Sequence, residues 1–343
     1  MNKKLPLFRH VITPLFFLII NIHAQDSTEH INHLAHPDTL TDSLMTETED
    51  STESVLIILD SSAVDSPKAD DVGIIKAVGD TIKPENQDKK IDLPKKSSKI
   101  NNHAFEVGEK LKFKIRFGFI RAGTAEMKVL SKKQKEKRMV YHIQTTAKSV
   151  SAFNWMYKVD DVVNTYMDTD GLYPIRFEKK LREGGYKADL FVDYIPENST
   201  AKVEFIRYEK NMKEKSRKNF SIKTPKYVQD VLSAFYFIRN MDIEVGKSIF
   251  MSNHDKDKVY DLEVKVYEKE IIEVEAGRFR CLVVEPMMKG EGLFKQKGSL
   301  KIWLTDDDRK IPVQMTSEIL VGHITTELIK IEGVKGEIKA KLD

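Results

Sequence analysis

The strongest constraint on the fold is a two-residue rhythm in residues 113–129, FKIRFGFIRAGTAEMKV. Apolar side chains alternate with Lys, Arg or Gly as far as Phe119, which is the period of a half-buried β-strand. The pattern breaks there, passes Gly123 and then resumes. Because glycine tolerates backbone angles that other residues resist, GFIRAG at 118–123 predicts the turn of a hairpin. One long strand interrupted by a bulge is the alternative.

The same rhythm recurs toward the C-terminus, most clearly at 186–194, 260–266 and 300–305. Segments rich in Gly, Asp, Asn and Pro separate these runs, so roughly a dozen or more strands follow at the spacing of a sandwich or barrel. Strands do not alternate with helices in this pattern, which disfavours a parallel sheet. We therefore predict a mainly β domain over residues 101–343, an antiparallel barrel or half-barrel.

One segment, TPKYVQDVLSAFYFIRNM at 224–241, departs from the strand rhythm. At helical spacing it forms an apolar stripe from Val228, Val231, Leu232, Phe235 and Ile238. Thr224 can cap the start, and Pro225 suits the first helical position. We expect an amphipathic helix over 225–241 that packs on the concave side of the sheet.

Residues 1–24 have the pattern of an export signal. Basic residues precede an apolar run of about a dozen residues, which is short for a membrane span, and Ala24 is a small residue at which a signal peptidase could cut. We expect an exported protein of the periplasm or cell envelope of a Gram-negative-type bacterium. After cleavage it would not be an integral membrane protein.

Residues 25–100 are predicted to be an acidic, disordered tether, because they carry too little apolar surface to offset the entropy of folding. Two apolar islands, 55–60 and 72–79, interrupt it, and each could add a strand to a sheet edge or dock on a partner.

Charge divides along the same boundary. The chain has a net charge of +3, residues 1–24 carry +3, and residues 25–100, with 16 acidic and 8 basic side chains, carry −8. Residues 101–343 therefore carry +8. A basic body suits an anionic partner such as a phosphorylated lipid or envelope polysaccharide. Because the protein is expected to be exported, nucleic acid is a poor candidate.

The single cysteine, Cys281, cannot form an internal disulfide, and its place in an apolar strand pattern predicts a buried, unreactive thiol. Histidines are sparse in the predicted domain. In the tether, the spacing of His30, His33 and His36 is compatible with weak binding of zinc or copper, but we interpret them as solvated polar side chains and predict no metal site.

Four stretches stand in this order along the chain: LKFKIRFGFIRAGTAEMKV, YKVDDVVNTYMDTDGLYPIRFEKKLREGG, VQDVLSAFYFIRN and GSLKIWLTDDDRKIPVQM. Together they resemble one bacterial family, the domain of unknown function 3108 family. The residues that carry most of the likeness are Gly123, Asp230, Ser233, Trp303, Asp307, Arg309, Ile311 and Pro312. The resemblance covers 101 to about 335 and none of the tether. It implies export and a β-rich, barrel-like fold, and it brings no reaction and no catalytic residue.

No motif for catalysis stands out in the sequence. Metalloprotease, serine-hydrolase, phosphate-loop and dinucleotide motifs do not occur. The adjacent Asp160 and Asp161 would point to opposite faces of a strand and so could not act as a pair. We expect no cofactor and no enzymatic activity.

The aromatic-rich strands and the polar positions of the helix are the remaining candidates for a site. A strand that is apolar on both faces could line a ligand cavity, although ordinary core packing is the default interpretation. The candidate ligand-binding residues are Gln229, Asp230, Ser233, Tyr166 and Trp303.

The function expected from these observations is binding or carriage of an apolar or amphiphilic, anionic ligand such as a lipid or envelope glycan. The first alternative is an assembly factor that binds another envelope protein, with the tether as a docking segment. The second is a hydrolase that acts on an envelope polymer.

Overall fold

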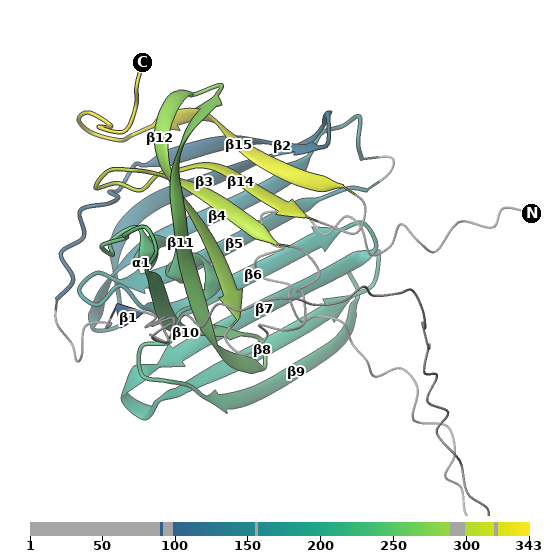
Figure 1. The fold of residues 1–343 in the computed structure, drawn as a ribbon. Helices are drawn as coiled ribbons and strands as arrows, with labels where there is room; N and C mark the ends of the chain where they lie inside the picture. The colour runs from purple at the N-terminus through teal and green to yellow at the C-terminus, as the bar shows by residue number, and fades with distance from the viewer. Residues whose placement is uncertain (1–89, 92–98, 155–156, 289–298, 319–321) are drawn as a thin grey trace, which may run out of the picture. The chain divides into compact units, whose positions relative to one another are not determined.

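The computed structural model describes residues 90–91, 99–154, 157–288, 299–318 and 322–343. The predicted signal peptide, most of the predicted tether, and His30, His33 and His36 lie outside the described residues. Within the described residues the chain forms a sheet of fifteen strands and one α-helix (Figure 1).

The strands, in chain order, are β1 (Lys90–Ile91), β2 (Lys110–Phe117), β3 (Ile120–Lys135), β4 (Arg138–Ser149), β5 (Asp160–Asp168), β6 (Pro174–Glu183), β7 (Tyr186–Ile195), β8 (Thr200–Tyr208), β9 (Glu214–Lys223), β10 (Ser248–Asp255), β11 (Lys258–Val274), β12 (Gly277–Met288), β13 (Leu300–Thr305), β14 (Pro312–Glu318) and β15 (His323–Glu332). A short 3₁₀ helix, η2 (Pro196–Asn198), joins β7 to β8, and the α-helix α1 (Val231–Ile238) lies between β9 and β10.

Two antiparallel meanders, β2 to β9 and β10 to β15, are joined because β15 pairs with β2. Among the named strands of the described part, β1 and β10 pair in parallel. At the ends of the strand order, β1 and β9 each pair with a single strand of the described part, so the sheet does not close. The predicted antiparallel β fold is confirmed, in its open form: the sheet curves around α1 without forming a complete barrel (Figure 1).

The first hairpin explains the broken rhythm at 113–129. The turn is Gly118–Phe119, and Ala122 is the extra residue of a bulge at which the pairing of β2 with β3 shifts register. A Cβ atom at Gly123 would lie 2.6 Å from the carbonyl oxygen of Lys148 on β4. Glycine is therefore required for β3 to approach β4 this closely, and the chain combines the hairpin and the bulge.

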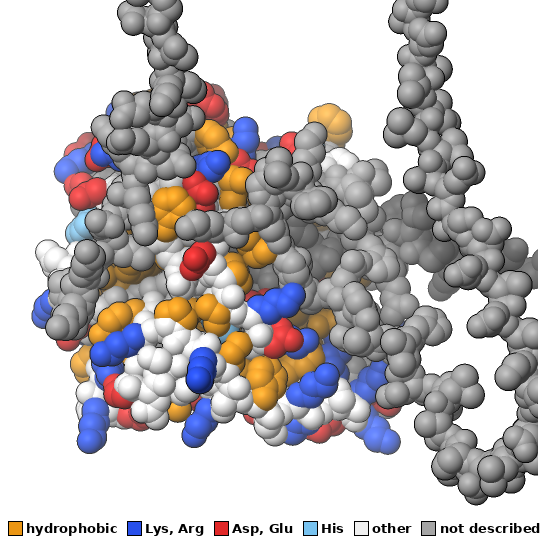
Figure 2. Space-filling model, turned by 60° about the horizontal axis from the view of Figure 1, so that its bottom comes forward, with side chains coloured by type: hydrophobic (Ala, Val, Ile, Leu, Met, Phe, Trp, Pro, Cys, Tyr) orange, Lys and Arg blue, Asp and Glu red, His pale blue; other side chains and the backbone are white. Residues whose placement is uncertain are grey.

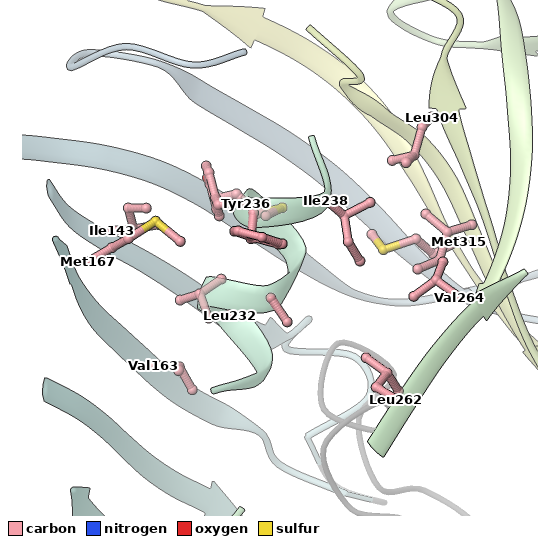
Figure 3. Close-up of a cluster of buried hydrophobic side chains, with 14 of the residues drawn as sticks. Ile143, Val163, Met167, Leu232, Tyr236, Ile238, Leu262, Val264, Leu304 and Met315 are labelled. Carbon is pink, nitrogen blue, oxygen red and sulfur yellow. The ribbon is translucent and has the colours of Figure 1, made fainter. Parts of the chain in front are cut away.

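The core lies on the concave face of the sheet, around α1. The buried side chains of β2 alternate with half-buried ones, as the sequence rhythm predicts. Leu232 and Tyr236 of α1 lie on the side of β4 and β5, whereas Ile238 lies toward β11, β13 and β14 (Figure 3). The helix therefore packs against both meanders at once, and its hydrophobic side chains contribute about 1.5–3 kcal/mol each when fully buried.

The helix is shorter than predicted. It begins at Val231 rather than at Pro225, and its N-cap is Asp230 rather than Thr224. The reason is that the preceding backbone forms a β-bridge: Gln229 pairs in parallel with Asn253 of β10. Residues bonded to a strand in this way cannot also form a helical turn.

A second, smaller apolar cluster contains Phe279, Cys281, Val283, Trp303 and Val313. Cys281 is fully buried, as predicted, and burial raises the pKa of its thiol to about 12. It is therefore unreactive at neutral pH. Among the described residues, α1 is far too short to span a membrane, and no other helix could do so.

Candidate functional site

The residues before α1 pair with the part of the β10 edge that lies beyond β1. The Gln229 N–H donates to the Ser252 carbonyl at 2.9 Å, and the His254 N–H donates to the Gln229 carbonyl at 2.8 Å. These bonds fix where the helix starts and place its first residues between the two meanders.

Asp230 fixes the start of the helix. Its carboxylate accepts a hydrogen bond from the Ser233 N–H at 2.7 Å, and the Ser233 hydroxyl accepts one from the Asp230 N–H at 2.9 Å, which forms a capping box. The Thr165 hydroxyl of β5 donates to the other carboxylate oxygen at 2.7 Å. Asp230 is fully buried, and this burial raises its pKa to about 6. The sequence-predicted Gln229, Asp230 and Ser233 thus come together.

Further polar contacts lie beside Asp230. The hydroxyl of Tyr194 on β7 lies 3.1 Å from His254 Nδ1, which links the two meanders. Within the second meander, Asn253 Nδ2 donates to the Tyr260 hydroxyl at 3.0 Å. Burial lowers the pKa of His254 against the opposing effect of Asp255, so its imidazole is neutral at neutral pH. Burial also raises the pKa of Tyr194 and, to about 12, that of Tyr260.

These side chains lie at the N-terminal end of α1, and we call them the N-terminal cluster after that end of the helix. They are Thr165, Tyr194, Gln229, Asp230, Ser233, Asn253, His254 and Tyr260. Within it, three buried atoms have no hydrogen-bond partner in the described residues: Gln229 Oε1, Asn253 Oδ1 and His254 Nε2. Their residues are 3%, 2% and 2% exposed. A buried polar group left unpaired costs about 1–3 kcal/mol, so such atoms indicate a position for water or a ligand.

A second buried polar group lies at the other end of the helix. Arg239 donates to both carboxylate oxygens of Glu109 at 2.7 and 2.8 Å, to the Ala104 carbonyl at 3.1 Å and to the Arg309 carbonyl at 3.0 Å. The side chains of Arg239 and Glu109 are 0% and 1% exposed. We call Ala104, Glu109, Arg239 and the Arg309 carbonyl the C-terminal cluster. Its hydrogen bonds are made within the protein.

A buried carboxyl pair, Asp161 and Glu183, lies where β5 meets β6, and no sequence pattern indicated it. Burial, together with the charge of Asp161, raises the pKa of Glu183 to about 9, and burial raises that of Asp161 to about 6. At neutral pH Glu183 therefore holds its proton and can donate a hydrogen bond to Asp161. As predicted, Asp160 points away from Asp161: its side chain is 49% exposed, whereas Asp161 is fully buried.

Two predicted site residues, Tyr166 and Trp303, do not join the N-terminal cluster. Tyr166 follows Thr165, so in a strand its side chain points to the opposite face, where it stacks on His142 with ring centroids 4.5 Å apart. Trp303 belongs to the smaller apolar cluster and donates to Glu270 at 2.9 Å. The residues that sequence reasoning missed are Thr165, Tyr194, Asn253, His254 and Tyr260.

The composition of the N-terminal cluster limits its chemistry. Both carboxylate oxygens of Asp230 already accept hydrogen bonds, from Ser233 and Thr165. The hydroxyl that contacts His254 belongs to Tyr194, whose pKa is raised. The described residues contain no group of three or more His, Cys, Asp or Glu side chains arranged to hold a metal ion. What the cluster offers is hydrogen-bonding capacity in a buried setting.

Comparison with known proteins places the chain in a family. The family model described as "Protein of unknown function (DUF3108)" matches residues 112–329. The chain belongs to the DUF3108 family. The match runs from β2 into β15 and includes α1 and the whole N-terminal cluster. No curated protein matches this DUF3108 chain.

Three solved structures are similar to this DUF3108 protein at low identity. A β-barrel-like protein of the DUF1849 family from Brucella abortus is 12% identical, with a TM-score of 0.43, over 67% of this chain and 98% of that one. A candidate exported protein with a YmcC-like fold from Bacteroides fragilis is 9% identical, with a TM-score of 0.31, over 66% and 97%. A candidate lipoprotein from Parabacteroides distasonis is 11% identical, with a TM-score of 0.30, over 69% and 100%. These values are too low to transfer any property to this chain.

Proposed function

We propose that this DUF3108 protein is an exported, non-enzymatic protein of the cell envelope that binds an apolar or amphiphilic, anionic molecule such as a lipid or an envelope glycan. The observation that carries the proposal is the set of unpaired, buried polar atoms in the N-terminal cluster. Two of them, Gln229 Oε1 and Asn253 Oδ1, are hydrogen-bond acceptors. These two acceptors suit a ligand whose polar end carries hydroxyl groups, such as a glycerol or sugar headgroup.

The surroundings of the cluster support an amphiphilic ligand. The inner face of β7 to β9 continues from Tyr194 as an apolar surface that includes the buried Leu190 and Val203. Phe205 and Phe220, on the same face, are only partly buried. Apolar surface beside a few convergent polar groups is the usual composition of a small-molecule site.

Charge supports an anionic ligand. Residues 101–343 carry a net charge of +8. On one face, Lys and Arg side chains lie along the margin of the described part with Asp and Glu side chains among them, and apolar side chains lie between them (Figure 2). The electrostatic field of a protein with a net positive charge raises the local concentration of anions near its surface.

Retention of a ligand tests the proposal. The purified protein, stripped of bound lipid, is mixed with an envelope extract and re-isolated, and retained molecules are identified by native mass spectrometry. We expect one retained class of lipid or glycan. Asn253→Leu should weaken its retention, whereas Asn219→Leu, at an exposed position on β9, should not. Repeated recovery of empty protein would contradict the proposal, and equal retention by Asn253→Leu would remove the cluster from it.

A second candidate function, assembly through a sheet edge, is favoured by one observation. Lys90–Ile91, at the end of the predicted tether, already pairs with β10 as a parallel strand. The edge of β9 has no strand partner within the described residues. A pull-down from envelope extract with and without residues 25–86 separates the two functions, because that deletion keeps β1. An assembly role predicts a partner protein that is lost with the deletion.

A further inference from the structure

The turn between β2 and β3 presents the most exposed large apolar side chain in the described part of the chain. Phe119 is 100% exposed, and the adjacent Ile120 is 59% exposed. The next residue, Arg121, is also exposed and makes no ion pair with any described residue. Two adjacent exposed apolar side chains therefore lie beside a cation without an ion pair. We call Phe119, Ile120 and Arg121 the tip.

The fold holds this tip away from the body. β2 is paired on both sides, with β15 and β3, and β3 is paired with β4. At the turn itself, the Gly118 N–H donates to the His323 carbonyl at 3.3 Å, and the Val150 N–H donates to the Ala122 carbonyl at 3.0 Å. Because both flanks are fixed, Phe119 cannot fold back onto the core.

Unpaired cations gather at the same end of the strands. In an antiparallel meander, the β2–β3, β4–β5 and β8–β9 connections all lie at one end. Arg121 lies at the start of β3, and the exposed Lys158, Lys210 and Lys213 lie in these connections, together with the exposed Glu209. None of these cations has an ion pair within the described residues, unlike Lys335 with Glu106 and Lys339 with Asp308 elsewhere on the surface.

We propose that this end of the sheet docks on an anionic lipid bilayer, with Phe119 and Ile120 entering the boundary between headgroups and acyl chains. Apolar side chains bury favourably at that depth, and Lys and Arg are attracted to lipid phosphates at the surface. Charge complementarity favours a lipid surface over an apolar protein groove as the partner. The docking does not depend on which ligand the N-terminal cluster holds.

Local insertion is tested with a tryptophan probe at the tip. Phe119→Trp is compared with Ile271→Trp, because Ile271 on β11 is 55% exposed and lies away from the tip. Each is mixed with vesicles of phosphatidylethanolamine and phosphatidylglycerol whose acyl chains are brominated, and the emission of the parent chain, which has two Trp, is subtracted. We expect a blue shift and quenching at 119 and neither at 271. Quenching at neither position, or equally at both, would overturn the proposal.

Loss of binding is the second readout. The double substitution Phe119→Ser and Ile120→Ser should lower partition onto these vesicles roughly 10-fold or more, and Ile271→Ser should leave it unchanged. Raising the salt concentration to ~0.5 M should weaken binding of the parent protein by screening the cations. Undiminished binding of the double variant, or binding only to membranes that retain their proteins, would overturn the proposal. Neither result affects the ligand-retention experiment, so the two proposals fail independently.

Discussion

The two ends of helix α1 are both buried and polar, but they differ in how completely their hydrogen bonds are made. At the C-terminal end, Arg239 makes four hydrogen bonds, two of them to Glu109. At the N-terminal end, Gln229, Asn253 and His254 each keep a buried atom without a partner in the described residues. Burial is equally deep at both ends, so it does not account for the contrast.

We propose that this difference separates a structural role from a binding role. A saturated buried network fixes one arrangement of the elements that it joins, and here Arg239 ties α1 to the segment before β2. An unsaturated one costs free energy that a purely structural cluster would avoid by using apolar residues. On this proposal the C-terminal cluster holds the fold and the N-terminal cluster binds the ligand.

The largest expected effect is at the C-terminal cluster. Glu109→Gln removes the charge that neutralises Arg239 and leaves a guanidinium buried without its counter-ion. Breaking a buried ion pair in this way costs about 3–5 kcal/mol of folding stability. Urea denaturation measures it as a lower midpoint with an unchanged slope.

A matched control is the exposed pair of Arg217 with Glu214. Arg217→Ala should leave the denaturation midpoint unchanged, because exposed ion pairs contribute little. If Glu109→Gln were as mild as this control, the C-terminal cluster would not hold the fold.

The sequence predicted the strands and the helix because both depend on local periodicity. It also indicated that Asp230 and Ser233 matter, since they are polar positions of the predicted helix and carry part of the family resemblance. It could not show that Thr165, 65 residues earlier in the chain, donates to Asp230, because that contact depends on how the sheet curves. The same limit applies to Tyr194 and His254, which meet only when the two meanders come together.

The two predictions from the sequence that were wrong in position also have specific causes. Tyr166 was expected in the site and lies on the opposite face, because one step along a strand reverses a side chain. The helix was expected from Pro225, but an unrecognised β-bridge at Gln229 delays its start. In both cases the residue type was informative and the tertiary pairing decided the outcome.

The next largest effect is a pH dependence that belongs to Asp230. Its pKa is about 6 in the folded protein and 3.8 in the reference state, so the folded state holds this proton more tightly. This contribution to stability is present below pH 4, falls as the pH rises through 6, and changes by about 2–3 kcal/mol. Asp230→Asn, which can still cap the helix, should remove it.

The measurement is the difference in unfolding free energy between the parent protein and Asp230→Asn at pH 4, 5, 6 and 7. Taking the difference cancels contributions from Asp161 and Glu183, which both proteins retain. Asp170→Asn is the control, because the side chain of Asp170 is 70% exposed. A pH-independent difference for Asp230→Asn would mean that the carboxylate is ionised without cost at the N-terminal cluster.

A smaller effect is expected from Ser233→Ala. This substitution removes one half of the capping box and leaves the Asp230 N–H without its acceptor. Loss of such a cap contact lowers the unfolding free energy by about 1 kcal/mol. A loss as large as that of Glu109→Gln would erase the distinction between the two ends of the helix.

The smallest effect, and the sharpest test of the comparison, is expected from Gln229→Met. Its Nε2 donates to the Leu172 carbonyl at 3.0 Å, and that hydrogen bond would be lost at a cost of about 1 kcal/mol. The substitution also removes the unpaired Oε1, whose burial is unfavourable by a similar amount, so the unfolding free energy of ligand-free protein should change by less than about 1 kcal/mol. Ligand retention should nevertheless fall. A strong loss of stability without ligand would show that Oε1 has a structural partner, and the N-terminal cluster would then be as architectural as the C-terminal one.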